Sequence, residues 1–482
     1  MPDLRPIFHI VGLLLTGLAV LMLVPAAADL MTDNPDWFVF WVASVVTGFC
    51  GVALILSNRR PNMALNIKQA FVLTTVTWVA LALFAALPFR FANDSLSFTG
   101  SVFEAASGLT TTGATVLTGL DAMPPGILLW RGLLQLVGGL GIIVMAIAIL
   151  PFLGVGGMQL LRTESSDRMD KVMPRARQIT IATARLYGLL AVVCGFGYWF
   201  GGMAPFDAAI HAMTTISSGG FSTSDSSIAH WPSTIVVWNA IVFMVLAGLP
   251  FTLYLKALKG SWRELVFDDQ VCLFAGIVAV ASGVIAIWLY ATGRYDAGAA
   301  ITQALFNVIS IITTTGFATT DYNLWGSMPL VVFALLLSVG GCTGSTAGGI
   351  KMLRFVVLWE MARCYVRQLV TPRGVFQQRF NGVPIAPDVV TSVMAFIGIY
   401  FATLVVVALV LSALGLDTLT SFSAAAACLG NVGPGLGEIV GPAGHYRSLH
   451  PAAIWVLSAA MIMGRLELFT VLVMCTRHFW RS

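Results

Sequence analysis

The chain has 482 residues, of which 58% are hydrophobic and only 10% are charged, and its formal net charge is +4. Its mean hydropathy is +0.88. A soluble globular domain needs a larger charged fraction to cover its surface, so this composition excludes that class and indicates a polytopic membrane protein. The seven cysteines are scattered without metal-ligand spacing, so neither a disulfide framework nor a zinc site is expected.

Apolar stretches of about 20 residues, long enough to cross a bilayer, recur along the chain. Ten spans are predicted, at 8–28, 37–57, 69–89, 124–152, 178–203, 232–256, 267–292, 325–353, 386–413 and 450–476. Basic residues cluster in alternate connections, at 59–68, 162–185, 256–263, 351–379 and 477–481. The positive-inside rule makes these connections, and both termini, cytosolic. The opposite connections are acidic, which would concentrate cations there or simply provide solvated loop charge.

The first predicted span has two interpretations. Arg5, an apolar run and "PAAADL" at 25–30 also resemble a secretory signal with an Ala-x-Ala cleavage site. We expect a retained helix instead, so that residues 1–66 form two N-terminal transmembrane helices.

A glycine-containing motif occurs four times after this pair. Its copies are "LTTTGATVLT" at 109–118, "ISSGGFSTSD" at 216–225, "ITTTGFATTD" at 312–321 and "LGNVGPGLGE" at 429–438. The aligned glycines lie about 100 residues apart, a period that indicates one folded unit repeated four times. The predicted units are 67–160, 161–262, 263–380 and 381–482.

Each unit has the same order of elements. A span is followed by a short amphipathic segment, the motif, a turn-rich stretch and a second span. The short segments are "SFTGSVFEAASGL", "APFDAAIHAMTTI", "DAGAAITQALFNVISII" and "LTSFSAAAACL". At about 10–15 residues they are too short to cross a bilayer and suit re-entrant helices. The predicted fold is an all-α polytopic membrane protein with four tandem span–pore-loop–span units around a pseudo-fourfold pore, plus the two N-terminal helices.

The motifs have the chemistry of a cation filter. Non-helical backbone at membrane depth persists only where it lines a water-filled path or is buried in protein. Glycine permits positive φ, so that carbonyls can turn to an axis, and hydroxyls can hold the loops or add oxygen ligands. The motif centres lack Asp and Glu, which favours coordination of a monovalent cation by carbonyls. The predicted filter residues are Thr111, Thr112, Gly113, Ser218, Gly219, Gly220, Thr314, Thr315, Gly316, Asn431, Val432 and Gly433.

A second glycine-rich stretch, "SVGGCTGSTAGGIK" at 338–351, falls in the return span of the third unit. Each glycine costs a helix about 1 kcal/mol relative to alanine, so an irregular intramembrane loop is predicted. The alternative is close helix packing by small residues. Arg465 lies within the last span, where a charge needs a partner or a water path. We expect carbonyls between Gly341 and Gly349 to accept its hydrogen bonds; alternatively it pairs with Glu467 or lies near the inner headgroups.

Four other polar residues fall in predicted helices. Glu104 either raises the cation potential or bonds a neighbouring loop, and Gln135 and Asn239 are expected to make polar helix contacts. His211 is expected to pack or hydrogen-bond within the second re-entrant helix.

At these motifs the chain resembles the Trk/Ktr/HKT superfamily of cation-transport membrane subunits, specifically the bacterial Trk-type potassium-translocating subunit, over nearly its whole length. In that family the filter glycine of each repeat contributes to potassium coordination, and Gly113, Gly220, Gly316 and Gly433 match those positions. Sodium-preferring relatives often carry Ser at the first position, so Gly113 indicates potassium. The resemblance includes the divergent fourth loop, "NVGPG".

The resemblance also implies a gate and partners. The intramembrane loop would act as the gate, with Arg465 holding it across the conduction path. Its gate residues are Gly340, Gly341, Thr343, Gly344, Ser345, Gly348, Gly349 and Arg465. A homodimer in the bacterial cytoplasmic (inner) membrane is implied, with a cytosolic nucleotide-binding (ATP or NAD) regulatory subunit.

The expected function is therefore potassium uptake, with K⁺ as the transported ion, the lipid bilayer as surroundings, and no organic cofactor or nucleic acid. A sodium-coupled or sodium-permeable member of the same superfamily is the main alternative. An inverted-repeat secondary transporter fits less well, because the four units share one polarity. A membrane enzyme would need a convergent catalytic set, which the spans lack in sequence. Channel-like permeation and proton- or sodium-coupled symport both remain open.

Overall fold

The computed structural model describes residues 3–59, 65–92, 96–148 and 172–481. The predicted boundary between units 1 and 2 at residue 160, the basic stretch 162–171 and the end of the predicted span 124–152 lie outside these residues. The other unit boundaries stay predictions. The described chain is mostly helical, and its one hairpin pairs β1 (Arg379–Phe380) with β2 (Val383–Pro384) in antiparallel register.

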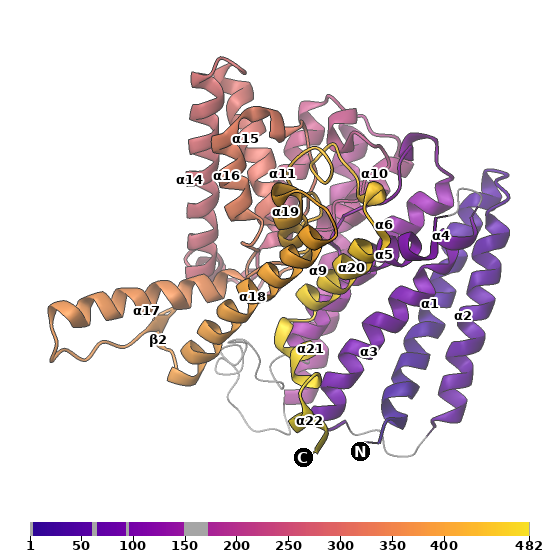
Figure 1. Ribbon diagram of the computed structural model, residues 1–482, viewed down its shortest axis with the longest axis horizontal. Coiled ribbons are helices and arrows are strands. Elements are labelled where there is room, and N and C mark those ends of the chain that lie inside the picture. The colour runs from indigo at the N-terminus through magenta and orange to yellow at the C-terminus, as the bar shows by residue number, and fades with distance from the viewer. Residues whose placement is uncertain (1–2, 60–64, 93–95, 149–171, 482) are drawn as a thin grey trace.

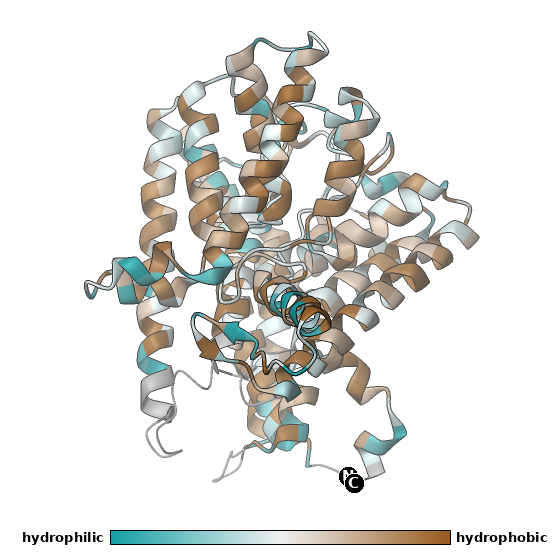
Figure 2. Ribbon diagram, turned by 90° about the vertical axis from the view of Figure 1, so that its left-hand side faces the viewer, coloured by the Kyte–Doolittle hydropathy of each residue, from teal (hydrophilic) through white to brown (hydrophobic). Residues whose placement is uncertain are grey.

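Seven helices among the described residues are long and apolar enough to cross a membrane. They are α1 (Arg5–Met31), α2 (Trp37–Ser57), α3 (Ile67–Ala85) continued by α4 (Leu87–Phe91), α6 (Pro125–Ala148), α9 (Val172–Phe200), α14 (Asp269–Ala291) and α18 (Pro387–Ala413). Figure 2 shows hydrophobic residues along the lengths of the long helices. Large apolar side chains such as Phe49 and Ile287 remain more than 70% exposed, as expected for surfaces that face lipid.

Two predicted spans are wrong as continuous helices. The span 232–256 consists of α11 (Thr234–Gly248) and α12 (Phe251–Ala257), bent by 94°. Pro250 stands at this break, and it can neither donate its nitrogen to the helix nor allow helical geometry at the preceding residue. The span 450–476 consists of α20 (Pro451–Arg465) and α21 (Leu468–Met474), bent by 111°. Glu467, at this second break, has a left-handed φ of 65°.

The predicted span 325–353 begins as a short helix, α16 (Ser327–Leu336), and then loses helical form until α17 (Met352–Val370). The predicted irregular loop is therefore present, and the alternative of small residues packing within a continuous helix is wrong. Counting each bent pair as one span, and α16 as the start of another, the architecture agrees with the prediction of about ten spans.

Four short helices occupy the positions predicted for re-entrant segments. They are α5 (Phe98–Leu109), α10 (Pro205–Ile216), α15 (Ala297–Ile312) and α19 (Thr418–Leu429). At 1.5 Å per residue a 12-residue helix spans about 18 Å, little more than half of the hydrocarbon layer. The side chains of Ser97, Asp296 and Asp417 cap the first turns of α5, α15 and α19, and Pro205 starts α10. We call these four the pore helices.

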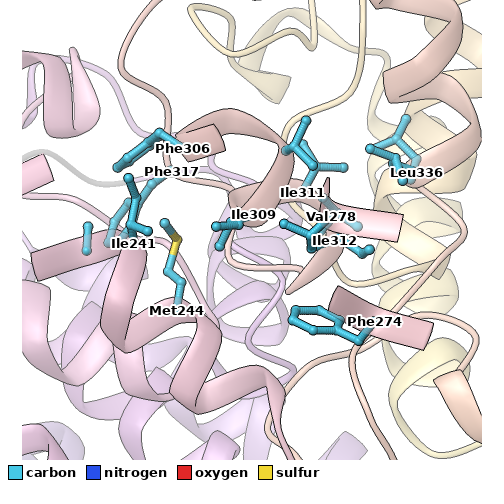
Figure 3. Close-up of a cluster of buried hydrophobic side chains, with 14 of the residues drawn as sticks. Ile241, Met244, Phe274, Val278, Phe306, Ile309, Ile311, Ile312, Phe317 and Leu336 are labelled. Carbon is cyan, nitrogen blue, oxygen red and sulfur yellow. The ribbon is translucent and has the colours of Figure 1, made fainter. Parts of the chain in front are cut away.

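Two large apolar clusters enclose the pore helices. Figure 3 shows part of the first, in which Ile309 and Ile312 of α15 lie between Met244 of α11 and Phe274 of α14. The second joins the N-terminal pair and α20 to α5. Within that pair a Cβ added to Gly12 would stand 2.7 Å from the carbonyl oxygen of Gly51, so α1 and α2 cross in close contact.

Figure 1 shows both termini at one end of the molecule and α17 extending sideways past α14. The remaining elements are short. They are α13 (Trp262–Val266), α22 (Arg477–Arg481) and the single turns η1 (Leu120–Ala122), η3 (Ser227–His230), η4 (Tyr322–Trp325) and η5 (Tyr446–Ser448).

Candidate functional site

The four motifs adopt the same backbone conformation. Each pore helix is followed by a four-residue loop, whose first residue is Thr110, Ser217, Thr313 or Gly430. The second residue is left-handed although it is not glycine: φ is 52° at Thr111, 54° at Ser218, 55° at Thr314 and 54° at Asn431. The fourth is the aligned glycine, and φ is 83° at Gly113, 72° at Gly220, 81° at Gly316 and 99° at Gly433. We call residues 110–113, 217–220, 313–316 and 430–433 the filter loops.

The third residue of each filter loop turns its amide back to its own pore helix. The amides of Thr112, Gly219, Thr315 and Val432 donate to the carbonyl five residues earlier at 2.8–2.9 Å. Non-glycine residues with φ near 55° are strained and persist only where the surroundings enforce them. Four equivalent occurrences show that the motif encodes one conformation.

The four filter loops close into a ring. A Cβ added to Gly113 would stand 2.2 Å from the carbonyl oxygen of Gly219, and one added to Gly220 would stand 1.7 Å from that of Thr315. The sequence of contacts continues from Gly316 to the carbonyl oxygen of Val432 (2.3 Å) and returns from Gly433 to that of Thr112 (2.5 Å). Each glycine thus faces the third-residue carbonyl of the next loop, so a side chain at any of them would collide with this ring of four oxygens.

The surroundings of the ring favour a cation. The four pore helices point their carbonyl ends, which carry partial negative charge, into the filter loops. The threonine and serine residues of the loops are fully buried. Two pairs of these hydroxyls bond within their own loops: Thr110 to Thr112 at 2.7 Å and Thr313 to Thr315 at 2.9 Å. The backbone carbonyls, without a carboxylate among the filter residues, are therefore the oxygens presented to the ring.

The fourth loop is held differently. Asn431 donates from Nδ2 to Thr112 Oγ1 and to the carbonyl of Met461, both at 2.9 Å. The hydroxyl of Tyr446, a residue that the sequence analysis did not single out, donates to the carbonyl of Gly433 at 2.8 Å. The ring is consequently only pseudo-fourfold, as its sequence indicates.

The intramembrane loop, residues 338–351, lies directly against the filter loops. Its two limbs pair as a parallel bridge between Val339 and Ile350. A Cβ on Gly340 would stand 1.9 Å from the carbonyl oxygen of Gly348, so these limbs approach as only glycine permits. The amide of Gly348 donates to Thr314 Oγ1 at 2.6 Å, and Thr346 Oγ1 is 2.8 Å from Ser218 Oγ.

The broken helices support the other side of this loop. The amide of Cys342 donates to the carbonyl of Gly248 at 2.9 Å, and that of Thr346 to Ala247 at 3.3 Å. Those two carbonyls are free at the C-terminus of α11 because the helix breaks there. The bend that the sequence analysis missed therefore supplies the loop with acceptors.

Arg465 reaches the intramembrane loop as predicted. Its Nη1 donates to the carbonyl of Thr346 at 3.0 Å, and the residue is 3% exposed. Its Nε and Nη2 have no hydrogen-bond partner among the described residues. The alternative pairing with Glu467 is wrong, because Glu467 Oε2 accepts from Arg354 Nη2 at 2.5 Å. Lys351 adds a second cation at the loop, since its Nζ donates to the carbonyl of Ala347.

The connections before and after the pore helices carry ionised carboxylates. A hydrogen bond from the Ser224 side chain holds the pKa of Asp121 below its usual range. The Thr420 side chain does the same for the pKa of Asp417. Both groups are therefore charged at neutral pH, which agrees with the acidic character predicted for these connections.

The four weaker candidates have structural contacts, and Gln135 donates from Nε2 to the carbonyl of Gly219 at 2.7 Å. Glu104 accepts from Thr115 Oγ1 (2.9 Å) and from Arg131 Nε (2.9 Å), so it bonds the loop beside it. His211 Nδ1 donates to the carbonyl of Asp207 at 2.8 Å, since a carbonyl can only accept. Asn239 joins α11 to the carbonyl of Cys194 in α9, as expected of a polar helix contact.

Arg131 was missed by the sequence analysis. It lies inside the predicted span 124–152, and like Arg465 it is a charge within an apolar span that needs a partner or a water path.

Four pore helices that end in a closed ring of filter loops define the class: this is a multi-pass membrane protein with a four-repeat pore-loop architecture. The family described as "TrkH: Cation transport protein" matches residues 38–264 and 271–480. The chain therefore belongs to the TrkH family of cation transport proteins.

Relatives agree over the full length. The Trk system potassium uptake protein TrkI of Halomonas elongata is 43% identical over 479 residues, covering 99% of this chain and 97% of that protein. TrkH of Vibrio parahaemolyticus is 39% identical over 491 residues, covering 99% of both. The crystal structure of the potassium transporter TrkH from Vibrio parahaemolyticus matches with a TM-score of 0.92 at 37% identity, covering 100% of both chains.

Proposed function

We propose that this chain takes up potassium across the bacterial cytoplasmic membrane through a filter of backbone carbonyls. The relatives named as potassium uptake proteins support potassium as the ion. The observation that carries the proposal is the closed ring, in which each filter glycine contacts the third-residue carbonyl of the next loop. Carbonyl oxygens held at fixed spacing replace the hydration shell of a cation without requiring any side-chain charge.

The intramembrane loop is the proposed gate. Gly348 and Thr346 contact Thr314 and Ser218 of the filter loops, so the loop lies next to the ion path. Arg465 holds Thr346, and its buried charge adds an electrostatic barrier to a passing cation. Opening requires these contacts to break together, because all of them involve residues 346–348.

The proposed membrane orientation and subunit assembly are those that the resemblance to Trk-type subunits implies. Both termini face the cytosol, which agrees with their place at one end of the molecule (Figure 1) and with the basic connections. A second copy of the chain completes a homodimer, and a cytosolic nucleotide-binding subunit controls the gate.

Ion flux into proteoliposomes tests the proposed function directly. The purified chain is reconstituted, and uptake is measured under separate gradients of potassium, rubidium, sodium and lithium. Potassium and rubidium are expected to enter faster than sodium and lithium. Equal or faster sodium entry would overturn the proposal in favour of a sodium-permeable member of the same family.

A further inference from the structure

One transmembrane helix packs along the back of the second filter loop. Three residues of α6 at one-turn spacing, Arg131, Gln135 and Gly139, lie on one face of that helix. A Cβ added to Gly139 would stand 2.8 Å from the Cβ of Ser217, the first residue of the loop. Arg131 Nη1 donates to the carbonyl of Ser222 at 2.8 Å, just beyond the loop's end.

Gln135 occupies the centre of this contact and brackets the filter glycine. Its Nε2 donates to the carbonyl of Gly219 at 2.7 Å, and its Oε1 accepts from the amide of Phe221 at 3.1 Å. These groups belong to the peptides on either side of Gly220. The side chain is fully buried, so water does not compete for either bond.

The carbonyl that Gln135 holds belongs to the ring. The oxygen of Gly219 is the one that faces Gly113 of the first loop. A carbonyl oxygen has two lone pairs, so it can accept from Gln135 behind the loop and still present the other lone pair to the ion path. Among the residues that the structure describes, Gly219 has the only ring carbonyl that accepts a hydrogen bond from a side chain.

This contact explains why the second motif has glycine where the first and third have threonine. Thr112 and Thr315 bond the hydroxyl two residues earlier in their own loops. At Gly219 there is no such side chain, and an added Cβ would stand 2.3 Å from Cδ of Gln135. The carboxamide of Gln135 therefore fills the space of the missing threonine and takes over its part in fixing the loop.

We propose that Gln135 is a selectivity-positioning residue: its carboxamide fixes the ring carbonyl of Gly219 from behind, in place of the threonine that the other loops use. The inference rests on the proposed carbonyl filter and deepens it. Gln135 acts through the backbone of the second loop, so its removal is expected to alter the choice between cations more than the rate of transport.

The test compares Gln135→Leu with Asn239→Leu, which removes a half-buried carboxamide contact between α11 and α9. Potassium and sodium fluxes are measured in proteoliposomes. The increase in unfolding temperature that each salt produces is measured in detergent, because a bound ion stabilises the folded state. Gln135→Leu is expected to lower the potassium-to-sodium flux ratio by roughly tenfold, as for the loss of a buried hydrogen bond, and to shrink the extra stabilisation by potassium. Asn239→Leu is expected to keep both.

A pair of substitutions separates positioning from general damage. Gly219→Thr alone is expected to lose selectivity, because its side chain collides with Gln135. In the double variant Gln135→Ala/Gly219→Thr the threonine has room and can bond Ser217, as Thr112 bonds Thr110, so the preference for potassium is expected to return. A double variant no better than the single ones would overturn the proposal. This comparison also applies if Gln135→Leu fails to fold.

Gly220→Ala, measured in parallel, distinguishes a failure of the positioning role of Gln135 from a failure of the carbonyl filter itself. If Gly220→Ala abolishes the preference while Gln135→Leu retains it, the positioning role is refuted and the filter stands. If Gly220→Ala itself retains the preference, the carbonyl filter and the inference built on it both fail.

Discussion

Replacing Arg465 by alanine is expected to open the proposed gate. Among the described residues the guanidinium makes one hydrogen bond, from Nη1 to the carbonyl of Thr346 at 3.0 Å. A hydrogen bond from a charged group contributes about 1.5–3 kcal/mol. Because about 1.4 kcal/mol corresponds to a factor of ten in an equilibrium constant, losing it shifts the balance towards the open loop by about 10- to 150-fold.

The assay is the basal potassium flux of the reconstituted chain without a regulatory partner, at equal protein per vesicle. The flux of Arg465→Ala is expected to rise within that range, while the potassium-to-sodium ratio stays unchanged because the filter loops are intact. Arg465→Lys keeps the charge and a donor, so a smaller rise is expected. Arg363→Ala is the matched control, since that side chain is 51% exposed and pairs with Glu360 three residues earlier. An unchanged or lower flux of Arg465→Ala would refute the role of this contact.

Three further predictions concern contacts around the filter. Thr314→Val removes the acceptor of the Gly348 amide. An unsatisfied buried donor costs about 1–3 kcal/mol, so the basal potassium flux should rise about 5- to 150-fold while the potassium-to-sodium ratio is kept. An unchanged flux would contradict the link between filter and gate. Glu104→Ala leaves the buried Arg131 without its carboxylate partner and should lower the free energy of unfolding by about 3–5 kcal/mol. Glu264→Ala, which breaks an exposed pair with Lys256, should change it by about 0–1 kcal/mol. Thermal unfolding in detergent compares the two variants, and equal losses would count against the buried pair. Tyr446→Phe removes the hydrogen bond to the carbonyl of Gly433. Because a neutral hydrogen bond contributes about 0.5–1.5 kcal/mol, the potassium-to-sodium flux ratio should fall by less than tenfold. A ratio equal to that of the wild type would mean that Asn431 holds the fourth loop alone.

The repeated parts of the fold were predictable from sequence because each copy supports the others. The four pore helices fall within a residue or two of the predicted segments, since a short amphipathic run before a glycine motif recurs with the same spacing. The intramembrane loop was predictable from glycine content alone. The contact between Arg465 and the loop was predictable because a charge in an apolar span must find polar atoms.

The breaks in α11–α12 and α20–α21 were not predicted because hydropathy averages over a window and a bend leaves it unchanged. Pro250 was a local signal that the apolar pattern concealed. Glu467, with its left-handed φ, gave none, and its ion-pair partner Arg354 lies 113 residues away in sequence. The match between Gln135 and Gly219 was equally hidden, since only the packing of α6 brings the two together.

The aligned glycines are proposed to form the ion filter, and a comparison of Gly316→Ser with Gly119→Ser is the sharpest test of that proposal. Both glycines have positive φ, so both substitutions strain the backbone, but they differ in surroundings. A Cβ at Gly316 would stand 2.3 Å from the carbonyl oxygen of Val432, whereas at Gly119 it meets no heavy atom within 4 Å among the described residues. We expect Gly316→Ser to lose the preference for potassium over sodium and Gly119→Ser to keep it. If Gly316→Ser retains the preference, the glycines serve only to shape the loops, and the carbonyl filter is contradicted.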